Sequence, residues 1–175
     1  PIKEVVFVFI GRLEKNKELT RLVRVFNQLV GSRSSNVLSL VFLGDGPERQ
    51  KLELLVNQLH IKKNVTFLGA SYDENFIMKL LTRASYLVSP GNVGLSAMHS
   101  LIAGTPVVTH GDMRYQMPEA EVVINNETGF LFQRGSDESL YEILNIATDR
   151  HLINPLNSKN CQEKIIDNYS YSYQK

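Results

Sequence analysis

Short apolar runs that alternate with amphipathic helical patterns are the feature that most constrains how this chain can fold. The first run, Val5–Ile10, contains only β-branched and aromatic residues, as expected of a strand buried on both faces. Further strand-like runs lie at 37–43, 65–69, 86–88 and 107–109, and helical patterns separate them at 19–30, 48–59, 75–84 and around 95–102. This order predicts right-handed crossovers and an α/β fold, a Rossmann-like parallel sheet with helices on both faces.

The last third of the chain is less regular. Glu121–Ile124 is predicted as a sixth short strand, and a second apolar run follows at Phe130–Phe132. A helix is expected over 138–148, and residues 151–175 are interpreted as a C-terminal helical extension. The chain opens on Pro1 and enters a strand within a few residues, so we expect a fragment of a longer protein.

Composition narrows the class of protein. The 175 residues carry a formal net charge of +1, which gives no reason to expect bulk nucleic-acid binding. No apolar run approaches the roughly 20 residues of a membrane helix, and no signal peptide is visible. Cys161 is the only cysteine, which excludes an internal disulfide and suits a reducing compartment. The sequence has no metal-ligand spacing, P-loop or Gly-x-Ser-x-Gly motif.

The stretch Ser89–Thr109 joins a strand end, a Gly/Pro loop, a short helix and another strand. Turn-forming residues occupy 89–92, and Gly104 with Pro106 ends the helix. Such a loop places free backbone N–H groups at the carboxyl edge of the sheet, where phosphate can bind. Because most strand–loop–helix units bind nothing, an ordinary connection remains the alternative interpretation.

Two other loops at the same edge carry candidate residues. Arg12 and Lys17 follow the first strand and could clamp a diphosphate, although on these two residues alone a basic solvated loop is the favoured interpretation. Gly44 and Gly46 follow the second strand and could let backbone approach a ligand, or could form only a tight turn. Arg49 stands where a dinucleotide fingerprint needs its third glycine, which disfavours a dinucleotide site.

Two histidines are weaker candidates. His99 lies in the short central helix, and Asn92, seven residues earlier, could point the same way. A satisfied structural histidine is the alternative there. His110 ends the fifth strand, with Asp112 and Arg114 close behind, and this group forms either a site rim or a surface loop.

Five segments resemble, in order and spacing, the signatures of the retaining GT-B glycosyltransferases of family 4, the group 1 glycosyltransferases. They are Gly11-Arg12-Leu13 with Lys17, Leu43–Pro47, Val65–Gly69, Gly94-Leu95 with Ala103–Val108, and Pro118-Glu119 with Glu127–Leu131. The resemblance covers the chain to about residue 150. Each signature alone is weak, but five in order are specific.

The resemblance implies that residues 1–175 form the C-terminal, nucleotide-sugar-binding domain of a two-domain enzyme, one half of a GT-B fold whose N-terminal acceptor domain is absent. Arg12 and Lys17 would be catalytic, holding the donor diphosphate and stabilising the leaving group. The implied donor-binding residues are Gly11, Gly44, Gly46, Pro47, Phe67, Leu68, Gly69, Gly91, Asn92, Val93, Gly94, Leu95 and His99. Among these, Gly91–Leu95 would donate backbone N–H groups to phosphate and sugar, and Phe67–Gly69 would meet the base.

The implied donor is a UDP- or GDP-sugar, and no metal or other cofactor is obligatory. The implied reaction is retaining transfer of a hexosyl group to an acceptor glycan or lipid-linked sugar, in polysaccharide or glycolipid synthesis. We expect a cytoplasmic enzyme, with peripheral attachment to the inner membrane through the missing domain as a further option. The fragment alone is expected to bind donor nucleotide weakly and to turn over nothing.

Two positions depart from the pattern of this family. The family commonly carries two glutamates eight residues apart, and Gly91 and His99 stand at those positions here. His99 can still bind ribose through a ring nitrogen, and Asn92 can replace in part the contact to the donor sugar. Two alternatives stay open: a GT-B-related nucleotide-sugar epimerase, and a non-catalytic nucleotide-binding or interaction module that lost the glutamates.

Overall fold

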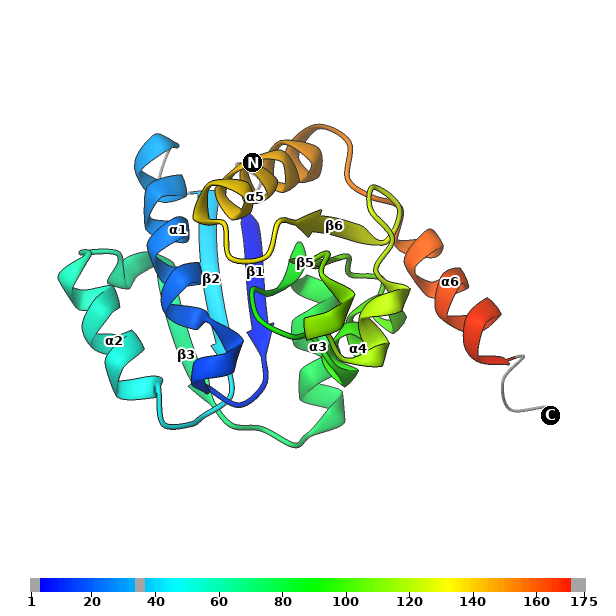
Figure 1. Ribbon diagram of the computed structural model, residues 1–175, viewed down its shortest axis with the longest axis horizontal. Helices are drawn as coiled ribbons and strands as arrows, with labels where there is room; N and C mark the ends of the chain where they lie inside the picture. Colours follow the sequence, from blue (N-terminus) through cyan, green and yellow to red (C-terminus); the bar gives the residue numbers. More distant parts are fainter. Residues whose placement is uncertain (1–3, 34–36, 171–175) are drawn as a thin grey trace.

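Six parallel strands form one sheet in the computed structural model, which describes residues 4–33 and 37–170. The strands are β1 (Val5–Ile10), β2 (Leu38–Leu43), β3 (Val65–Gly69), β4 (Tyr86–Ser89), β5 (Val107–His110) and β6 (Gly129–Phe132). Their spatial order is β3-β2-β1-β4-β5-β6, and every pairing is parallel (Figure 1). The predicted Rossmann-like α/β fold is confirmed.

Helices cover both faces of this sheet. They are α1 (Leu19–Ser32), α2 (Arg49–Gln58), α3 (Glu74–Arg83), α4 (Leu95–Ile102), α5 (Asp137–Ile153) and α6 (Ser158–Ser170), with short 3₁₀ turns η1 (Lys15–Lys17), η3 (Lys62–Asn64), η4 (Met113–Tyr115) and η5 (Pro118–Val122). Phe26 of α1, Leu52 of α2 and Leu144 of α5 belong to one buried cluster. Leu81 of α3 and Leu101 of α4 belong to another, so the apolar stripe of each helix is buried on one side of the sheet.

The direction in which strands are added reverses at β1. This strand pairs with β2 on one side and with β4 on the other, in register Phe7–Leu40 and Phe7–Tyr86. Ligands of open parallel sheets bind outside the carboxyl ends of the strands at such a point. The loops that follow β1 and β4 therefore lie at the edge where a ligand is expected.

The prediction of a sixth strand at Glu121–Ile124 is wrong. Residues 118–122 form η5, and the sixth strand is the later run Gly129–Phe132, which pairs with β5. The hydroxyl of Thr128 donates to the carbonyl oxygen of Val122 (2.7 Å) and accepts from the N–H of Ile124 (2.7 Å). A side chain thus satisfies the backbone groups that a neighbouring strand would otherwise have paired.

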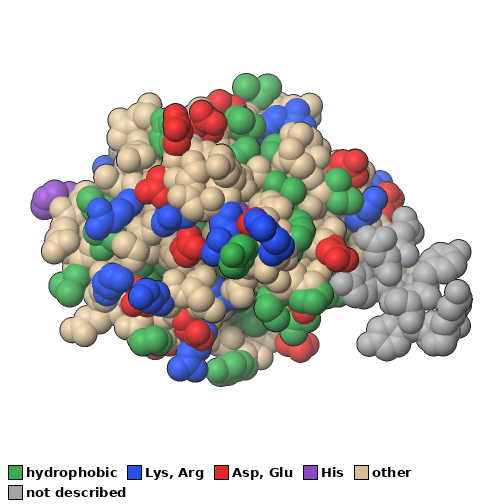
Figure 2. All heavy atoms as spheres, viewed as in Figure 1, with side chains coloured by type: hydrophobic (Ala, Val, Ile, Leu, Met, Phe, Trp, Pro, Cys, Tyr) green, Lys and Arg blue, Asp and Glu red, His purple; other side chains and the backbone are tan. Residues whose placement is uncertain are grey.

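The chain after the sheet returns to α4. Cys161 and Ile165 of α6 are buried in the same cluster as Ala97 and Leu101 of α4. Residues 171–175 of the expected helical extension lie outside the described residues. Within the described ranges, no helix has the length and apolar character needed to cross a bilayer. Acidic and basic side chains are interspersed over the face shown in Figure 2, in keeping with the small net charge.

Candidate functional site

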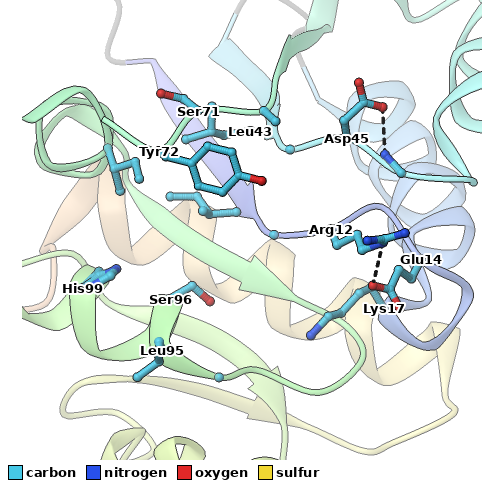
Figure 3. Close-up of a pocket in the computed structure, with 17 residues that line it drawn as sticks. Arg12, Glu14, Lys17, Leu43, Asp45, Ser71, Tyr72, Leu95, Ser96 and His99 are labelled. Carbon is cyan, nitrogen blue, oxygen red and sulfur yellow. Dashed lines mark hydrogen bonds and ion pairs between the residues drawn. The ribbon is translucent and has the colours of Figure 1, made fainter. Parts of the chain in front are cut away.

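A cleft of about 790 Å³ lies at the carboxyl edge of the sheet (Figure 3). The loops after β1, β2 and β3 and the first turns of α4 form its walls. The lining residues are Ile10, Gly11, Arg12, Glu14, Lys17, Leu43, Gly44, Asp45, Gly46, Ala70, Ser71, Tyr72, Ile77, Gly94, Leu95, Ser96 and His99. Eight of the sequence-predicted site residues are therefore brought to one hollow: Gly11, Arg12, Lys17, Gly44, Gly46, Gly94, Leu95 and His99.

Lys17 joins the loop after β1 to the loop after β4. Its Nζ donates to the side-chain Oδ1 (2.6 Å) and the carbonyl oxygen (3.0 Å) of Asn92. The N–H of Gly91 donates to the carbonyl oxygen of Lys17 (3.1 Å). Burial lowers the pKa of the Lys17 ammonium, and the nearby Glu14 carboxylate opposes that shift. The ammonium is thus held in place by neutral oxygens at the wall of the cleft.

Glycine is required at position 91 because the two loops pack directly on each other. A Cβ at Gly91 would collide with the carbonyl oxygen of Asn16 and would lie 2.7 Å from the Cα of Lys17. No Cβ atom tolerates such contacts, so a side chain here needs the loop after β1 to move. Gly91 itself does not line the cleft.

Arg12 is more loosely held than Lys17. Its side chain is 71% exposed, and its Nε lies 3.1 Å from Glu14 Oε1. An exposed pair of this kind contributes only about 0–1 kcal/mol, so the guanidinium can exchange Glu14 for an anionic ligand at low cost. Figure 3 shows Arg12 and Lys17 on one side of the cleft and His99 on the other.

The glycines after β2 are explained by the loop beside them. A Cβ at Gly46 would lie 2.8 Å from the backbone nitrogen of Leu13, and one at Gly44 would collide with the carbonyl oxygen of Gly11. The N–H of Leu13 donates to the carbonyl oxygen of Asp45 (2.9 Å). These glycines therefore allow the loops after β1 and β2 to pack closely, and the two packed loops form one wall of the cleft.

The first turn of α4 presents backbone donors to the cleft. Gly94 is the N-cap residue and makes no side-chain cap, so the N–H groups of Gly94, Leu95 and Ser96 have no partner among the described residues. All three residues line the cleft. The family resemblance also implies phosphate contacts for the N–H groups of Gly91 and Val93, but these groups donate inside the protein, to the carbonyl oxygen of Lys17 and to Gln116 Oε1. The backbone N–H groups available to a ligand are therefore those of the first turn of α4, not those of Gly91 and Val93.

Several predicted residues do not line the cleft. They are Pro47, Phe67, Leu68, Gly69, Gly91, Asn92 and Val93. Phe67 stacks on Phe42 with ring centroids 4.9 Å apart, and the carbonyl oxygen of Gly69 accepts from the N–H of Gly44 (2.8 Å). The residues that follow them, Ala70, Ser71 and Tyr72, form the wall instead.

Sequence reasoning missed Tyr72 and Gln116. Tyr72 is 94% exposed, and its ring projects over the cleft in Figure 3. Gln116 does not touch the cleft but holds the loop after β4 through the N–H of Val93 (2.8 Å). An aromatic residue three positions after the end of the third predicted strand was a usable signal for Tyr72. Nothing in the sequence pattern marks Gln116.

His110 belongs neither to the cleft nor to a surface loop. It is buried against Phe132, and burial, followed by the positive charge of Arg134, lowers its pKa. Asp112 and Arg114 form an exposed pair outside it (3.0 Å). No group of three or more His, Cys, Asp or Glu side chains able to hold a metal occurs among residues 4–33 and 37–170.

The family model described as "Glycosyl transferases group 1" matches residues 1–163. The chain belongs to the group 1 glycosyltransferases. Over 108 residues it is 32% identical to an uncharacterised glycosyltransferase of Methanocaldococcus jannaschii, covering 60% of this chain and 27% of that protein. Over 132 residues it is 26% identical to N-acetyl-alpha-D-glucosaminyl L-malate synthase of Bacillus anthracis, covering 75% and 33%. The chain thus spans about a third or less of these relatives.

Solved glycosyltransferases share the fold of this group 1 chain. A mutant of S. aureus TarM in complex with fondaparinux, alpha-GlcNAc-glycerol and UDP has a TM-score of 0.84 at 20% identity, covering 97% of this chain and 34% of that one. Anabaena HepE in complex with UDP has a TM-score of 0.76 at 20% identity, covering 94% and 44%. The C-terminal domain of the group 1 protein LpcC from Francisella tularensis has a TM-score of 0.77 at 17% identity, covering 97% and 88%.

Proposed function

We propose that this chain is the nucleotide-sugar-binding domain of a retaining, family 4 glycosyltransferase. The observation that carries the proposal is that Lys17, fixed by Asn92, lines the same cleft as the open N-terminus of α4. Backbone donors at a helix N-terminus and a nearby ammonium suit the oxygens of a diphosphate. UDP in the complexes of TarM and HepE, which share the fold, adds support for a nucleotide donor.

Each wall of the cleft has a role in this proposal. Arg12 and Lys17 bind the diphosphate and neutralise the charge that develops on it as the glycosidic bond breaks. The N–H groups of Leu95 and Ser96 bind phosphate oxygens, and His99 donates or accepts a hydrogen bond at the ribose hydroxyls. The base lies toward the wall formed by Ala70, Ser71 and Tyr72, which directly follow the predicted stretch Phe67–Gly69.

In this proposal, the acceptor-binding site lies in another part of a longer enzyme. The chain covers about a third of its curated relatives, so we assign acceptor binding to a second, N-terminal domain. The full enzyme would transfer a hexosyl group from a UDP- or GDP-sugar to a glycan or lipid-linked sugar, in the cytoplasm and without an obligatory metal. The chain alone would bind donor nucleotide weakly and turn over nothing.

Calorimetric titration of the chain with UDP, GDP and ADP tests the proposal. Lys17→Met is expected to weaken binding of the preferred nucleotide by about ten- to a hundredfold, since a charge-assisted hydrogen bond contributes roughly 1.5–3 kcal/mol. Lys15→Met is the matched control, because Lys15 lies on the same turn, is exposed and does not line the cleft. A folded wild-type chain that binds none of the three nucleotides would refute the proposal.

One observation favours a second candidate, a nucleotide-binding module without transferase activity. Position 91, where the family commonly has a glutamate, has no room for a side chain while the two loops pack as they do. Charge reversal at Arg12 and Lys17 in the full-length protein separates the candidates. A transferase loses turnover, whereas a module that acts only through a protein partner keeps that partner.

A further inference from the structure

The Gln116 side chain ties the loop after β4 to the end of β5. Its Nε2 donates to Thr109 Oγ1 (2.8 Å) and to the carbonyl oxygen of His110 (2.9 Å). Its Oε1 accepts from the N–H of Val93 (2.8 Å). Both amide hydrogens and the amide oxygen of Gln116 are therefore used. Two of the contacts are made to the end of β5, and the third is made to Val93, just before α4.

Val93 is the point at which this tether acts on the cleft. Val93 is 1% exposed and directly precedes Gly94, the N-cap residue of α4. Gly94 has no side chain to cap the helix, so the start of α4 depends on contacts made by neighbouring residues. The N–H of Val93 belongs to the Asn92–Val93 peptide plane, so Gln116 fixes the plane that directly precedes the two planes carrying the free N–H groups of Gly94 and Leu95.

A second series of hydrogen bonds connects the same tether to the lysine. Thr109 Oγ1, which accepts from Gln116, donates to the carbonyl oxygen of Ser89 (2.9 Å). Ser89 Oγ donates to the carbonyl oxygen of Asn92 (3.1 Å), and this oxygen also accepts from Lys17 Nζ. Thr109 and Ser89 are buried, so the series is shielded from competing water.

We propose that Gln116 is a positioning residue that holds the first turn of α4 and, through Asn92, the Lys17 ammonium in their ligand-binding arrangement. The nature of the ligand rests on the proposed function, since the bound group would be the diphosphate of a donor nucleotide. Gln116 itself does not line the cleft. Its effect on affinity therefore acts through Val93 and Asn92.

Two substitutions separate the parts of the tether. Gln116→Leu removes all three hydrogen bonds while keeping a similar volume. Gln116→Glu keeps an acceptor for the N–H of Val93 but loses both donors and places a carboxylate beside the carbonyl oxygen of His110. Gln50→Leu is the control, because Gln50 is an exposed glutamine on α2.

Amide hydrogen exchange, followed by NMR on the chain without ligand, gives a readout that does not depend on the proposed function. In Gln116→Leu the N–H of Val93 is expected to exchange about tenfold faster than in the wild type, after normalisation to the amides of β1, and Gln116→Glu should show a smaller increase. The affinity for UDP, or for whichever nucleotide binds best, should fall about tenfold in Gln116→Leu and remain unchanged in Gln50→Leu.

The possible outcomes decide separate questions. Unchanged exchange at Val93 overturns the proposal, and so does faster exchange with undiminished nucleotide affinity. A wild-type chain that binds no nucleotide refutes the proposed function. In that case the exchange rates alone still decide whether Gln116 positions the loop. If Gln116→Leu does not fold, Gln116→Glu carries the same comparison.

Discussion

The two cations of the cleft differ in how firmly they are held. Lys17 is half-buried and makes two hydrogen bonds to Asn92, whereas Arg12 is mostly exposed and, among the described residues, its side chain pairs with Glu14 alone, across 3.1 Å. A side chain that is already ordered loses less entropy when a ligand binds. We therefore expect Lys17 to contribute chiefly to affinity and Arg12 to respond to the ligand by changing partner.

Tyr72 gives a test of where the base lies. Tyr72→Ala should weaken UDP binding by about five- to a hundredfold, because stacking of a base on an aromatic ring contributes about 1–3 kcal/mol. Tyr72→Phe keeps the ring and should bind as the wild type does. The thermal midpoint should be the same in all three proteins, since the side chain is 94% exposed. Equal UDP affinity in the alanine variant would remove the base from this wall.

At the scale of single residues, the charged and titratable side chains of the site were easier to identify from the sequence than the amide side chain of Gln116 or the backbone N–H groups. Arg12, Lys17 and His99 were found because charged or titratable residues after strands and on the central helix are conspicuous, and all three line the cleft. Tyr72 and Gln116 were missed, because a loop residue follows no periodic pattern and the partners of Gln116 are up to 23 residues away. The use of the N–H groups of Gly91 and Val93 inside the protein also has no signature in the sequence.

At the scale of elements, apolar runs predicted five strands because parallel strands buried on both faces are apolar throughout. The same rule failed at Glu121–Ile124, where the buried Val122 ends a 3₁₀ turn and the buried Val123 directly follows it. A short apolar run does not distinguish a strand from a turn that packs on the core, and the partner hydroxyl of Thr128 lies outside the run. Helix α6 contacts α4 through the buried side chains of Cys161 and Ile165, and Gln162 Nε2 donates to the carbonyl oxygen of Ile102 (3.1 Å).

That contact can be tested with adjacent residues. Ile165 is 7% exposed and lies in the cluster with Leu101, whereas Ile166 is 61% exposed. Ile165→Asp should lower the free energy of unfolding by roughly 2–4 kcal/mol, because it buries a charge without a partner. Ile166→Asp should change it by less than about 0.5 kcal/mol. Urea denaturation of the two variants measures both values, and equal effects would mean that α6 does not dock through Ile165.

At the scale of the whole molecule, a parallel sheet with helices on both faces follows from alternation and right-handed crossovers, which is why the fold class could be predicted without coordinates. The site was predictable only to the level of loops, because the carboxyl ends of β1, β2 and β4 meet at one edge. Which side chains fill the space between those loops depends on long-range packing. The stability of the whole chain also has a pH dependence that can be derived from one buried thiol.

Burial raises the pKa of the Cys161 thiol from 9.0 to about 11. Between these two values the folded state keeps a proton that the unfolded state releases. The contribution of Cys161 to the free energy of unfolding is therefore fully present below pH 9 and is lost as the pH rises from 9 to about 11. The loss should reach on the order of 2 kcal/mol. Cys161→Ala should not show it, so the difference in free energy of unfolding between wild type and variant should narrow over this pH range. A difference that stays constant in urea denaturation at pH 8, 9.5 and 11 would contradict the assignment.

Because Gly91 packs on the backbone of Asn16 and Lys17, sequence changes in these two loops are coupled, although the loops are far apart in the chain. A mutation that gives residue 91 a side chain is tolerated only after the segment before α1 has shifted, and a shift of that segment removes the need for glycine. Among homologues, substitutions at position 91 should therefore occur together with changes in the loop before α1. Any attempt to graft a carboxylate onto position 91 should begin by rebuilding the turn at 14–17.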